Sequence, residues 1–322
     1  MRNNKLSRST QKNLVLFVIL LVLCAFFYSQ NNRFITVYNL TNMVRQSLPN
    51  FILGCGMTFV IASGAIDLSV GGTMALSAML YGYLCIWGIN PWLAVVIVAG
   101  FGVVVGIFNT VIMEKLQIPA IMATLATWII TAGMAMSVCK AIPITGPELK
   151  PITVLNSIKF GKIPLALPIC IVVIAVFLFL EKKTILGKYA IAIGGNDAAA
   201  HFSGINVTKM RACFFVLTGV LAGLSGVWQV ARLGSADPTI GTGMEFKVVA
   251  ACILGGVNIK GGEGTVSGVM IGTAILIVLT NGMQMMDIGS FYQDIATGLV
   301  LLASVLINSD SVGELMGKKA AA

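Results

Sequence analysis

The sequence predicts an all-α polytopic membrane protein with about ten transmembrane spans, organised as a single transmembrane domain over residues 1–322. Of its residues 57% are hydrophobic and 10% are charged, and the mean hydropathy is +0.93. Soluble domains carry about 25% charged residues, so this composition excludes a soluble protein. A helical span takes about 20 apolar residues, and stretches of that kind follow one another along the chain.

These apolar stretches define the expected elements in order. A weak cleavage site follows the first stretch, so we expect it to remain as an anchor rather than to be removed as a signal peptide. Residues 31–45 mix apolar side chains with asparagines and an arginine, which predicts an interfacial helix. Trp87 and Trp92 bracket a short turn, as aromatic side chains do at a membrane boundary. The expected spans lie near residues 13–29, 47–66, 70–88, 91–113, 118–138, 164–181, 210–231, 244–257, 266–286 and 292–308.

The distribution of Lys and Arg orients the chain, because cytoplasmic loops near span ends carry the excess. With the amino terminus inside and ten crossings, 13 of the 21 Lys and Arg residues lie on the cytoplasmic side and 8 lie outside or near the outer edge. Residues 182–209 then form a cytoplasmic loop and residues 139–163 an extracytoplasmic loop. The outer loop holds four lysines and one acid, Glu148, which fits either an acidic partner surface or an ordinary solvated loop.

A short helix is predicted within the cytoplasmic loop, over residues 194–205. Asn196 or Asp197 can cap its first amides, the alanines favour helix, and Gly204 supplies a left-handed stop. A helix this short is marginal in water, so docking against another protein would explain it; an ordinary ordered loop is the alternative. His201 is the only histidine and the seven cysteines show no C-x-x-C spacing, so no metal site is expected.

A polar break interrupts the apolar spans at residues 63–72, where Asp67 and Ser69 lie among glycines. These two residues can cap a half-helix that begins near Val70. Irregular backbone at membrane depth is tolerated only where it faces protein or a water-filled cavity, so we expect them to line or gate a central path, with a plain surface turn as the alternative. A proton relay through Asp67 is less favoured, because no second buried carboxylate or histidine accompanies it.

A second glycine-rich segment, residues 255–262, resembles the first when Gly64 is set against Gly255, which aligns Asp67 with Asn258. Such weak internal symmetry is typical of transporters built from two structural repeats, although one short match can arise by chance. The same glycines allow the last spans to include a re-entrant hairpin of two half-helices. We expect Asn258 to shape the central path together with Asp67.

The sequence contains no energy-coupling apparatus of its own. It has no G-x-x-x-x-G-K-[ST] phosphate loop, no soluble stretch long enough for an ATPase and no chain of buried acids for ion coupling. We therefore expect a pore subunit driven by a separate protein that docks at residues 194–205. An ion-coupled secondary transporter and a non-transport scaffold are the alternatives. An intramembrane enzyme is disfavoured, because the spans contain no paired catalytic groups.

Asp197-Ala198-Ala199 followed by Ser203-Gly204-Ile205 resembles the EAA-type cytoplasmic loop of ABC importer permeases. The wider segment 194–207 is similar to the ribose-type sugar permease subunit, although Asp197 stands where Glu is usual and His201 where Arg is common. Further segments resemble the same family in the same order, over nearly the whole chain: residues 56–61, 64–71, 230–233, 238–243 and 254–256.

The resemblance implies the permease subunit of an ATP-driven importer that works by alternating access. It further implies a permease dimer, an ABC ATP-binding subunit docked on the cytoplasmic loop, and a soluble binding protein outside that delivers a sugar or sugar-like solute. We expect Asp67, Ser69 and Asn258 to shape the path or its gates. The expected docking residues of the coupling helix are Gly195, Asn196, Asp197, Ala198, Ala199, Ala200, His201 and Gly204.

No catalytic residue is expected in this chain. We also expect it to bind no cofactor, metal or nucleic acid, because ATP and Mg²⁺ would be used by the partner ATPase. The expected location is the bacterial inner (plasma) membrane, crossed several times. The choice among pentoses, hexoses, sugar-like signals and nucleosides stays open, as does homodimer against heterodimer.

Overall fold

The computed structural model describes residues 8–308, and its helices confirm the predicted all-α polytopic fold. Each expected span overlaps one helix. Helices α1, α4, α5, α10 and α12 are each long and apolar enough to cross a bilayer alone. The elements that match the expected spans are α1 (Arg8–Gln30), α2 (Val37–Ala62), α3 (Val70–Ile86), α4 (Pro91–Lys115), α5 (Ala120–Cys139), α7 (Ala166–Lys183), α10 (Val207–Leu233), α11 (Met244–Leu254), α12 (Val266–Met285) and α13 (Ser290–Asn308).

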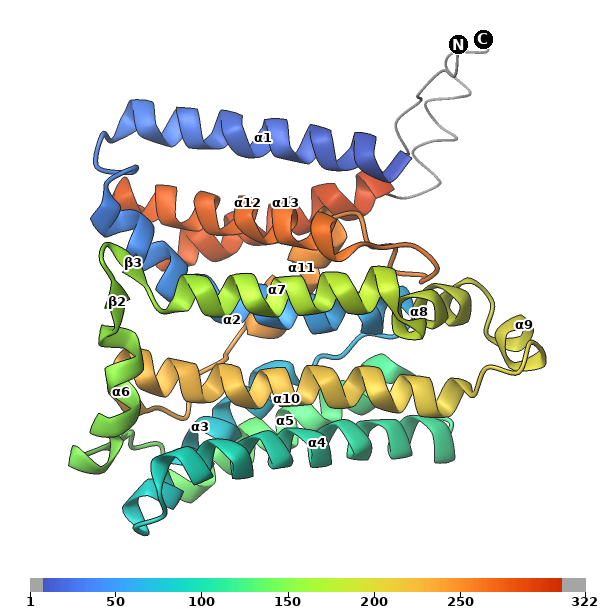
Figure 1. The fold of residues 1–322 in the computed structure, drawn as a ribbon, viewed down its shortest axis with the longest axis horizontal. Helices are drawn as coiled ribbons and strands as arrows, with labels where there is room; N and C mark the ends of the chain where they lie inside the picture. The colour runs from blue at the N-terminus through green and yellow to red at the C-terminus, as the bar shows by residue number, and fades with distance from the viewer. Residues whose placement is uncertain (1–7, 309–322) are drawn as a thin grey trace.

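The long helices lie side by side, and short elements cover their two ends (Figure 1). One end, which we call the α6 end, carries β1 (Ile144–Thr145), η1 (Pro147–Leu149), α6 (Lys150–Ser157), β2 (Lys159–Phe160) and β3 (Ile163–Pro164). The opposite end, which we call the α9 end, carries α8 (Ile185–Gly195) and α9 (Asp197–Phe202). β2 pairs with β3, and β1 pairs antiparallel with β4 (Ser235–Ala236).

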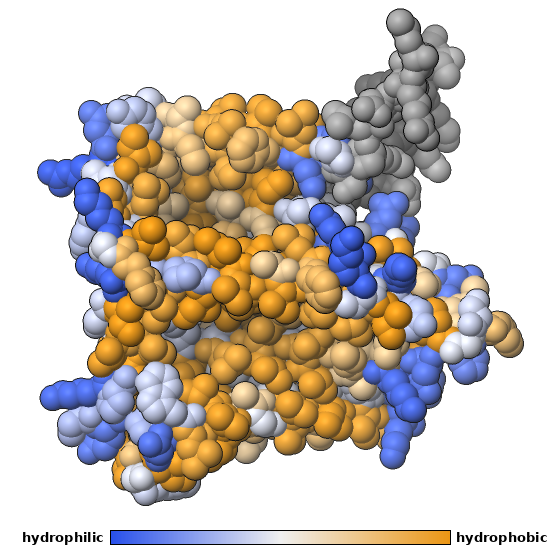
Figure 2. Space-filling model, in the orientation of Figure 1, coloured by the Kyte–Doolittle hydropathy of each residue, from blue (hydrophilic) through white to orange (hydrophobic). Residues whose placement is uncertain are grey.

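The surface shows the band expected of a multi-pass membrane protein. Hydrophobic residues cover the middle of the bundle and hydrophilic residues gather at its two ends (Figure 2). Large apolar side chains on the outer helices are exposed, for example Val22, Val96 and Met122 at 62%, 66% and 64%. Apolar surface of this extent is stable in lipid and not in water.

The prediction of an interfacial helix over residues 31–45 is wrong in its bounds, because no helix forms over residues 31–36 and α2 begins at Val37 and continues to Ala62. Of the polar residues in this stretch Asn39 faces protein, whereas Asn32, Arg33 and Thr36 are exposed. The side chain of Asn39 is buried and donates hydrogen bonds to the Phe34 carbonyl at 2.8 Å and to Asn281 Oδ1 at 2.8 Å. These bonds satisfy its amide inside the bundle.

Helix α2 also contains Pro49. Proline has no N–H, so the carbonyl of the residue four positions earlier, Arg45, loses its usual helical partner. That carbonyl accepts a hydrogen bond from Trp228 Nε1 on α10 at 2.9 Å instead. The proline is therefore accommodated by a side chain from a neighbouring helix.

Two of the expected spans contain short helices, each preceded by a segment without helix. Helix α3 has 17 residues and follows the irregular segment 63–69, and α11 has 11 residues and follows the irregular segment 234–243. An 11-residue helix rises about 16 Å, roughly half of the 30 Å hydrocarbon layer. Of the expected re-entrant hairpin only one arm is a half-helix, since α12 has 20 residues. α10 lies at the centre of the bundle and packs against α2, α3 and α4.

Candidate functional site

The short helix α9 forms as its sequence predicts. Asn196 is the cap, and its Oδ1 accepts a hydrogen bond from the Ala199 N–H at 2.9 Å. Gly204 adopts φ of +86°, a left-handed conformation that glycine takes at no steric cost. The Ile205 N–H then bonds back to the Ala200 carbonyl at 3.1 Å. The helix end is therefore closed by the glycine motif that the sequence indicates.

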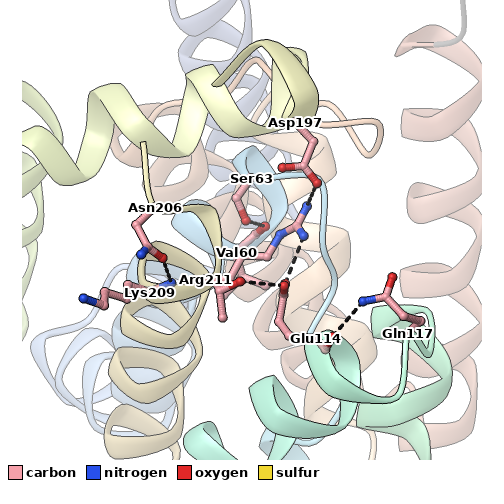
Figure 3. A network of polar contacts seen from close by, with 9 residues as sticks. Val60, Ser63, Glu114, Gln117, Asp197, Asn206, Lys209 and Arg211 are labelled. Carbon is pink, nitrogen blue, oxygen red and sulfur yellow. Dashed lines mark hydrogen bonds and ion pairs between the residues drawn. The ribbon is translucent and has the colours of Figure 1, made fainter. Parts of the chain in front are cut away.

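A charge network fastens α9 to the bundle (Figure 3). Arg211 on α10 donates to Asp197 Oδ2 at 2.9 Å and to Glu114 Oε1 at 3.1 Å, and Glu114 Oε2 accepts from Thr208 Oγ1 at 2.8 Å. Arg211 thus joins α9, α10 and the end of α4. From the sequence Arg211 is one of the 13 positive charges expected on the cytoplasmic side; its role in this network is not visible there, because its two partners are 14 and 97 residues away.

The outer surface of α9 is open. Asp197, Ala198, Ala199 and His201 are exposed, and Ala200 is the buried member of the helix. Phe202, the last residue of α9, is 88% exposed. α9 projects from the α9 end beyond the helical bundle (Figure 1). An exposed aromatic ring at the tip of a projecting helix is typical of a protein contact surface. Phe202 is not among the docking residues expected from the sequence.

Backbone contacts join the base of α9 to two glycine-rich breaks, residues 63–72 after α2 and residues 255–264 after α11. The Gly262 N–H donates to the Ala62 carbonyl at 2.9 Å. Gly194, at the end of α8, packs so closely on Ala62 and Gly262 that a Cβ atom there would collide with their backbone atoms, and Gly261 packs on both Gly64 and Gly194. We call this contact of Ala62, Gly64, Gly194, Gly261 and Gly262 the glycine junction. It brings residues 63–72 and 255–264 together beside α9.

The two breaks have related local geometry. α2 and α11 each end with a left-handed glycine, Gly64 with φ of +81° and Gly256 with φ of +84°. A polar side chain then accepts from the amide two residues ahead in each case, Asp67 from Ser69 and Asn258 from Lys260, both at 2.9 Å. The sequence alignment matched Gly64 with Gly255, whereas in the structure the left-handed glycine equivalent to Gly64 is Gly256. The distance along the chain from this glycine to the polar residue is therefore three residues in the first break and two in the second.

Asp67 and Ser69 belong to a buried polar network at the start of α3. Asp67 Oδ1 accepts from the Ser69 hydroxyl at 2.6 Å, and Ser69 Oγ accepts from Asn109 Nδ2 at 2.9 Å. Asn109 Oδ1 accepts from the Thr127 hydroxyl at 2.6 Å. All four residues are buried, so the network ties the start of α3 to α4 and α5. Asn258 lies apart from it, in the turn that follows α11, where its N–H donates to the Glu263 carbonyl at 3.0 Å.

A polar groove lies between α2, α11, α12 and α13. A hollow of about 210 Å³ there shares Gln46, Asn281 and Gln284 with a second hollow of about 400 Å³. The second hollow reaches Arg33 and Asp287, in the chain connections at the α6 end. We call the combined space the carboxamide groove, after the side chains of Asn42, Gln46, Asn50, Asn281, Gln284 and Gln293. Within residues 8–308 no group of three or more His, Cys, Asp or Glu residues is arranged to hold a metal ion.

Comparisons with known proteins agree with this architecture. Residues 39–305 match the family described as branched-chain amino acid transport system / permease component. The ribose import permease protein RbsC of Escherichia coli (strain K12) is 36% identical over 303 residues, which cover 93% of each chain. RbsC of Bacillus subtilis (strain 168) is 35% identical, with 86% of this chain and 87% of that protein covered. The L-arabinose transport system permease protein AraH of Escherichia coli (strain K12) is 32% identical, with 92% and 89% covered.

The relatives of this chain are transport permeases and not enzymes. They support the importer prediction over the ion-coupled alternative, and the family match spans most of the described helices. The chain therefore belongs to the branched-chain amino acid transport system / permease component family, as a permease subunit of an ABC importer.

Proposed function

We propose that this permease moves a sugar or sugar-like solute through the bacterial inner membrane by alternating access, powered by a separate ATP-binding subunit that docks on α9. The relatives carry the names of ribose and arabinose transporters, whereas the family description names branched-chain amino acids. An amino acid presents a carboxylate and an ammonium group. The cation that lines the inner hollow, Lys247, already lies 3.2 Å from Asp294, so the inner hollow favours an uncharged solute.

The single observation that carries the ATP-driven mechanism is the geometry of α9. It projects from the bundle with Asp197 and Phe202 exposed, yet Arg211 and the glycine junction tie its base to the long helices. A partner that grips α9 can therefore displace helices as well as bind. We assign docking to Gly195, Asn196, Asp197, Ala198, Ala199, Ala200, His201 and Gly204, with Phe202 added from its exposure.

The polar residues at the two glycine-rich breaks act on the translocation path by holding backbone segments in place. Asp67 and Ser69 fix the start of α3 against α4 and α5, and Asn258 holds the turn between α11 and α12. We propose that these residues shape the gates in this way. Displacement at α9 reaches Ala62 and Gly262 through the glycine junction, and hence α2 and α12. Packed helices switch between discrete arrangements, so a small shift can be converted into rocking of the bundle.

The remaining partners follow from the same proposal. The α9 end faces the cytoplasm, where the partner ATPase uses ATP and Mg²⁺. The α6 end, with residues 139–163, faces the binding protein that delivers the solute. A second permease subunit, taken here as an identical copy, completes the pore within the lipid membrane.

Two measurements test the proposal. The first compares what co-purifies with the wild-type chain and with an Asp197→Ala, Gly204→Pro double variant; an ATP-binding subunit should be recovered with the wild type only. The second follows uptake while the ion gradient or ATP is depleted separately, and uptake should require ATP. Uptake that collapses with the ion gradient while ATP persists would establish an ion-coupled transporter and overturn the proposal.

A further inference from the structure

The carboxamide groove is deep enough to hold a small solute. Its mouth lies at the α6 end beside Arg33 and Asp287, and its inner part reaches Met244 and Thr273 between α11 and α12. The outer hollow of about 400 Å³ falls within the range of about 300 to 1,000 Å³ that is typical of small-molecule sites. The groove therefore has the size of a binding vestibule that opens away from α9.

Several of its amide groups are available to a ligand. Within the described part of the chain, the side chains of Asn42, Gln46, Asn50 and Gln284 make no hydrogen bond to protein. Asn281 differs, because it exchanges hydrogen bonds with Asn39 at 2.8 and 3.1 Å. Each carboxamide offers two donors and one acceptor oxygen. Asn50 lies near the middle of α2, where a polar side chain in the membrane is costly, so its carboxamide turned into a hollow marks a functional surface.

The chemistry of the lining selects among ligands. The hydroxyls of Thr273 and Thr280 bond to carbonyls of their own helix, at 2.8 and 3.0 Å, which leaves the carboxamides as the principal recognition groups. They are neutral and carry both donors and acceptors, as a hydroxyl does. A ligand rich in hydroxyl groups matches this lining, whereas an ion would meet no fixed countercharge in the row of carboxamides.

We propose that the carboxamide groove is the surface on which this permease first holds an uncharged, polyhydroxylated solute after its release at the α6 end. The inference rests on the proposed function and adds to it the place of binding and the groups that bind. Gln46 and Asn50 lie one turn apart on α2, and Gln284 faces them from α12. A solute between them contacts α2, which ends at Ala62 of the glycine junction, and α12, which follows the loop that carries Gly261 and Gly262.

Labelling tests whether the groove is a water-filled vestibule. Gln46→Cys and Asn50→Cys are placed singly in the full chain, and cells are treated from outside with a membrane-impermeant thiol reagent. Both variants should react at least several-fold above the wild type, and the sugar that the wild type accumulates should slow the reaction. Val96→Cys, exposed on α4 within the apolar band, is the control and should stay at background. Groove cysteines that react no faster than Val96→Cys would overturn the inference.

Transport tests the recognition groups. Wild type, Gln46→Leu and Asn50→Leu are assayed for uptake of D-ribose, D-xylose and L-arabinose, with Gln30→Leu, an exposed carboxamide at the end of α1, as the matched control. Loss of hydrogen-bonding groups in a site built for hydroxyls lowers transport steeply, so uptake should fall at least tenfold in the groove variants while the ATP-binding subunit still co-purifies. Unchanged uptake would contradict the groove assignment alone. A wild type that takes up none of these pentoses and none of a panel of hexoses and nucleosides would contradict the polyhydroxylated cargo and with it the proposed function.

Discussion

The guanidinium of Arg211 on α10 lies 2.9 Å from the carboxylate of Asp197, the first residue of α9. The same guanidinium binds Glu114 at 3.1 Å. One side chain thus connects the projecting helix to two long helices, and a force applied to α9 reaches the bundle through it.

Arg211→Met should uncouple ATP hydrolysis from uptake. The pair with Asp197 is exposed on the Asp197 side, and exposed ion pairs contribute at most about 1 kcal/mol to stability. The pair with Glu114 is half-buried, so some stability is lost as α9 loses its tie to α4 and α10, but folding should persist. We expect the ATP-binding subunit still to co-purify, with uptake reduced about tenfold. Lys209→Met, an exposed residue of the same turn, is the control. An Arg211→Met permease with full uptake would show that the ion pairs carry no force.

Phe202→Ser should weaken docking without affecting the fold. The side chain is 88% exposed, so its removal creates no cavity, whereas burial of a phenylalanine in an interface is worth about 1.5 to 3 kcal/mol. Recovery of the ATP-binding subunit in pull-downs should fall at least tenfold at unchanged membrane abundance. Phe160→Ser, at the α6 end and 61% exposed, should leave recovery unchanged. Equal recovery from both variants would remove Phe202 from the interface.

Gly194→Ala and Gly195→Ala should behave differently although they are neighbours. A Cβ atom at position 194 would overlap the Ala62 carbonyl oxygen and the Gly262 nitrogen, whereas at position 195 it would meet open space. Overpacking costs about 1 to 3 kcal/mol, so Gly194→Ala should lower the melting temperature in detergent and abolish uptake. Gly195→Ala should keep the melting temperature of the wild type. Equal melting temperatures would contradict the close packing at the glycine junction.

Asp67→Ala should destabilise the start of α3. The substitution leaves the Ser69 N–H and hydroxyl without their acceptor in a buried site, at a cost of about 1 to 3 kcal/mol. Thermal unfolding in detergent should shift downward and uptake should fall. Asp67→Asn keeps an acceptor oxygen, so its loss should be smaller. The network assignment fails if Asp67→Ala melts with the wild type.

The sequence predicted the spans and α9 well because their causes are local. Long apolar runs are sufficient to place α4, α5 and α12, and the Asn196 cap with Gly204 is sufficient to delimit α9. The prediction failed at residues 31–45 because a polar residue such as Asn39, next to apolar ones, indicates a helix at the membrane interface as long as its hydrogen-bond partner is unknown. That partner, Asn281, lies 242 residues away.

The candidate site was only partly predictable for the same reason. Asp67, Ser69 and Asn258 stood out as polar residues in glycine-rich breaks, and each does organise local backbone. The roles of Arg211 and of the carboxamide groove could not be predicted from local sequence, because they depend on which helices pack against one another. A single amide in a long apolar helix is unremarkable until several face one hollow.

Pro49 divides α2 into two parts with different tasks. Gln46 lies just before it, in the groove, and Ala62 lies beyond it at the glycine junction. Because one backbone hydrogen bond is missing here, bending the helix costs least free energy at Pro49. The hydrogen bond from Trp228 to the Arg45 carbonyl stabilises the helix at this point. α2 therefore resists bending least at Pro49, between the segment that carries Gln46 and the segment that ends at Ala62.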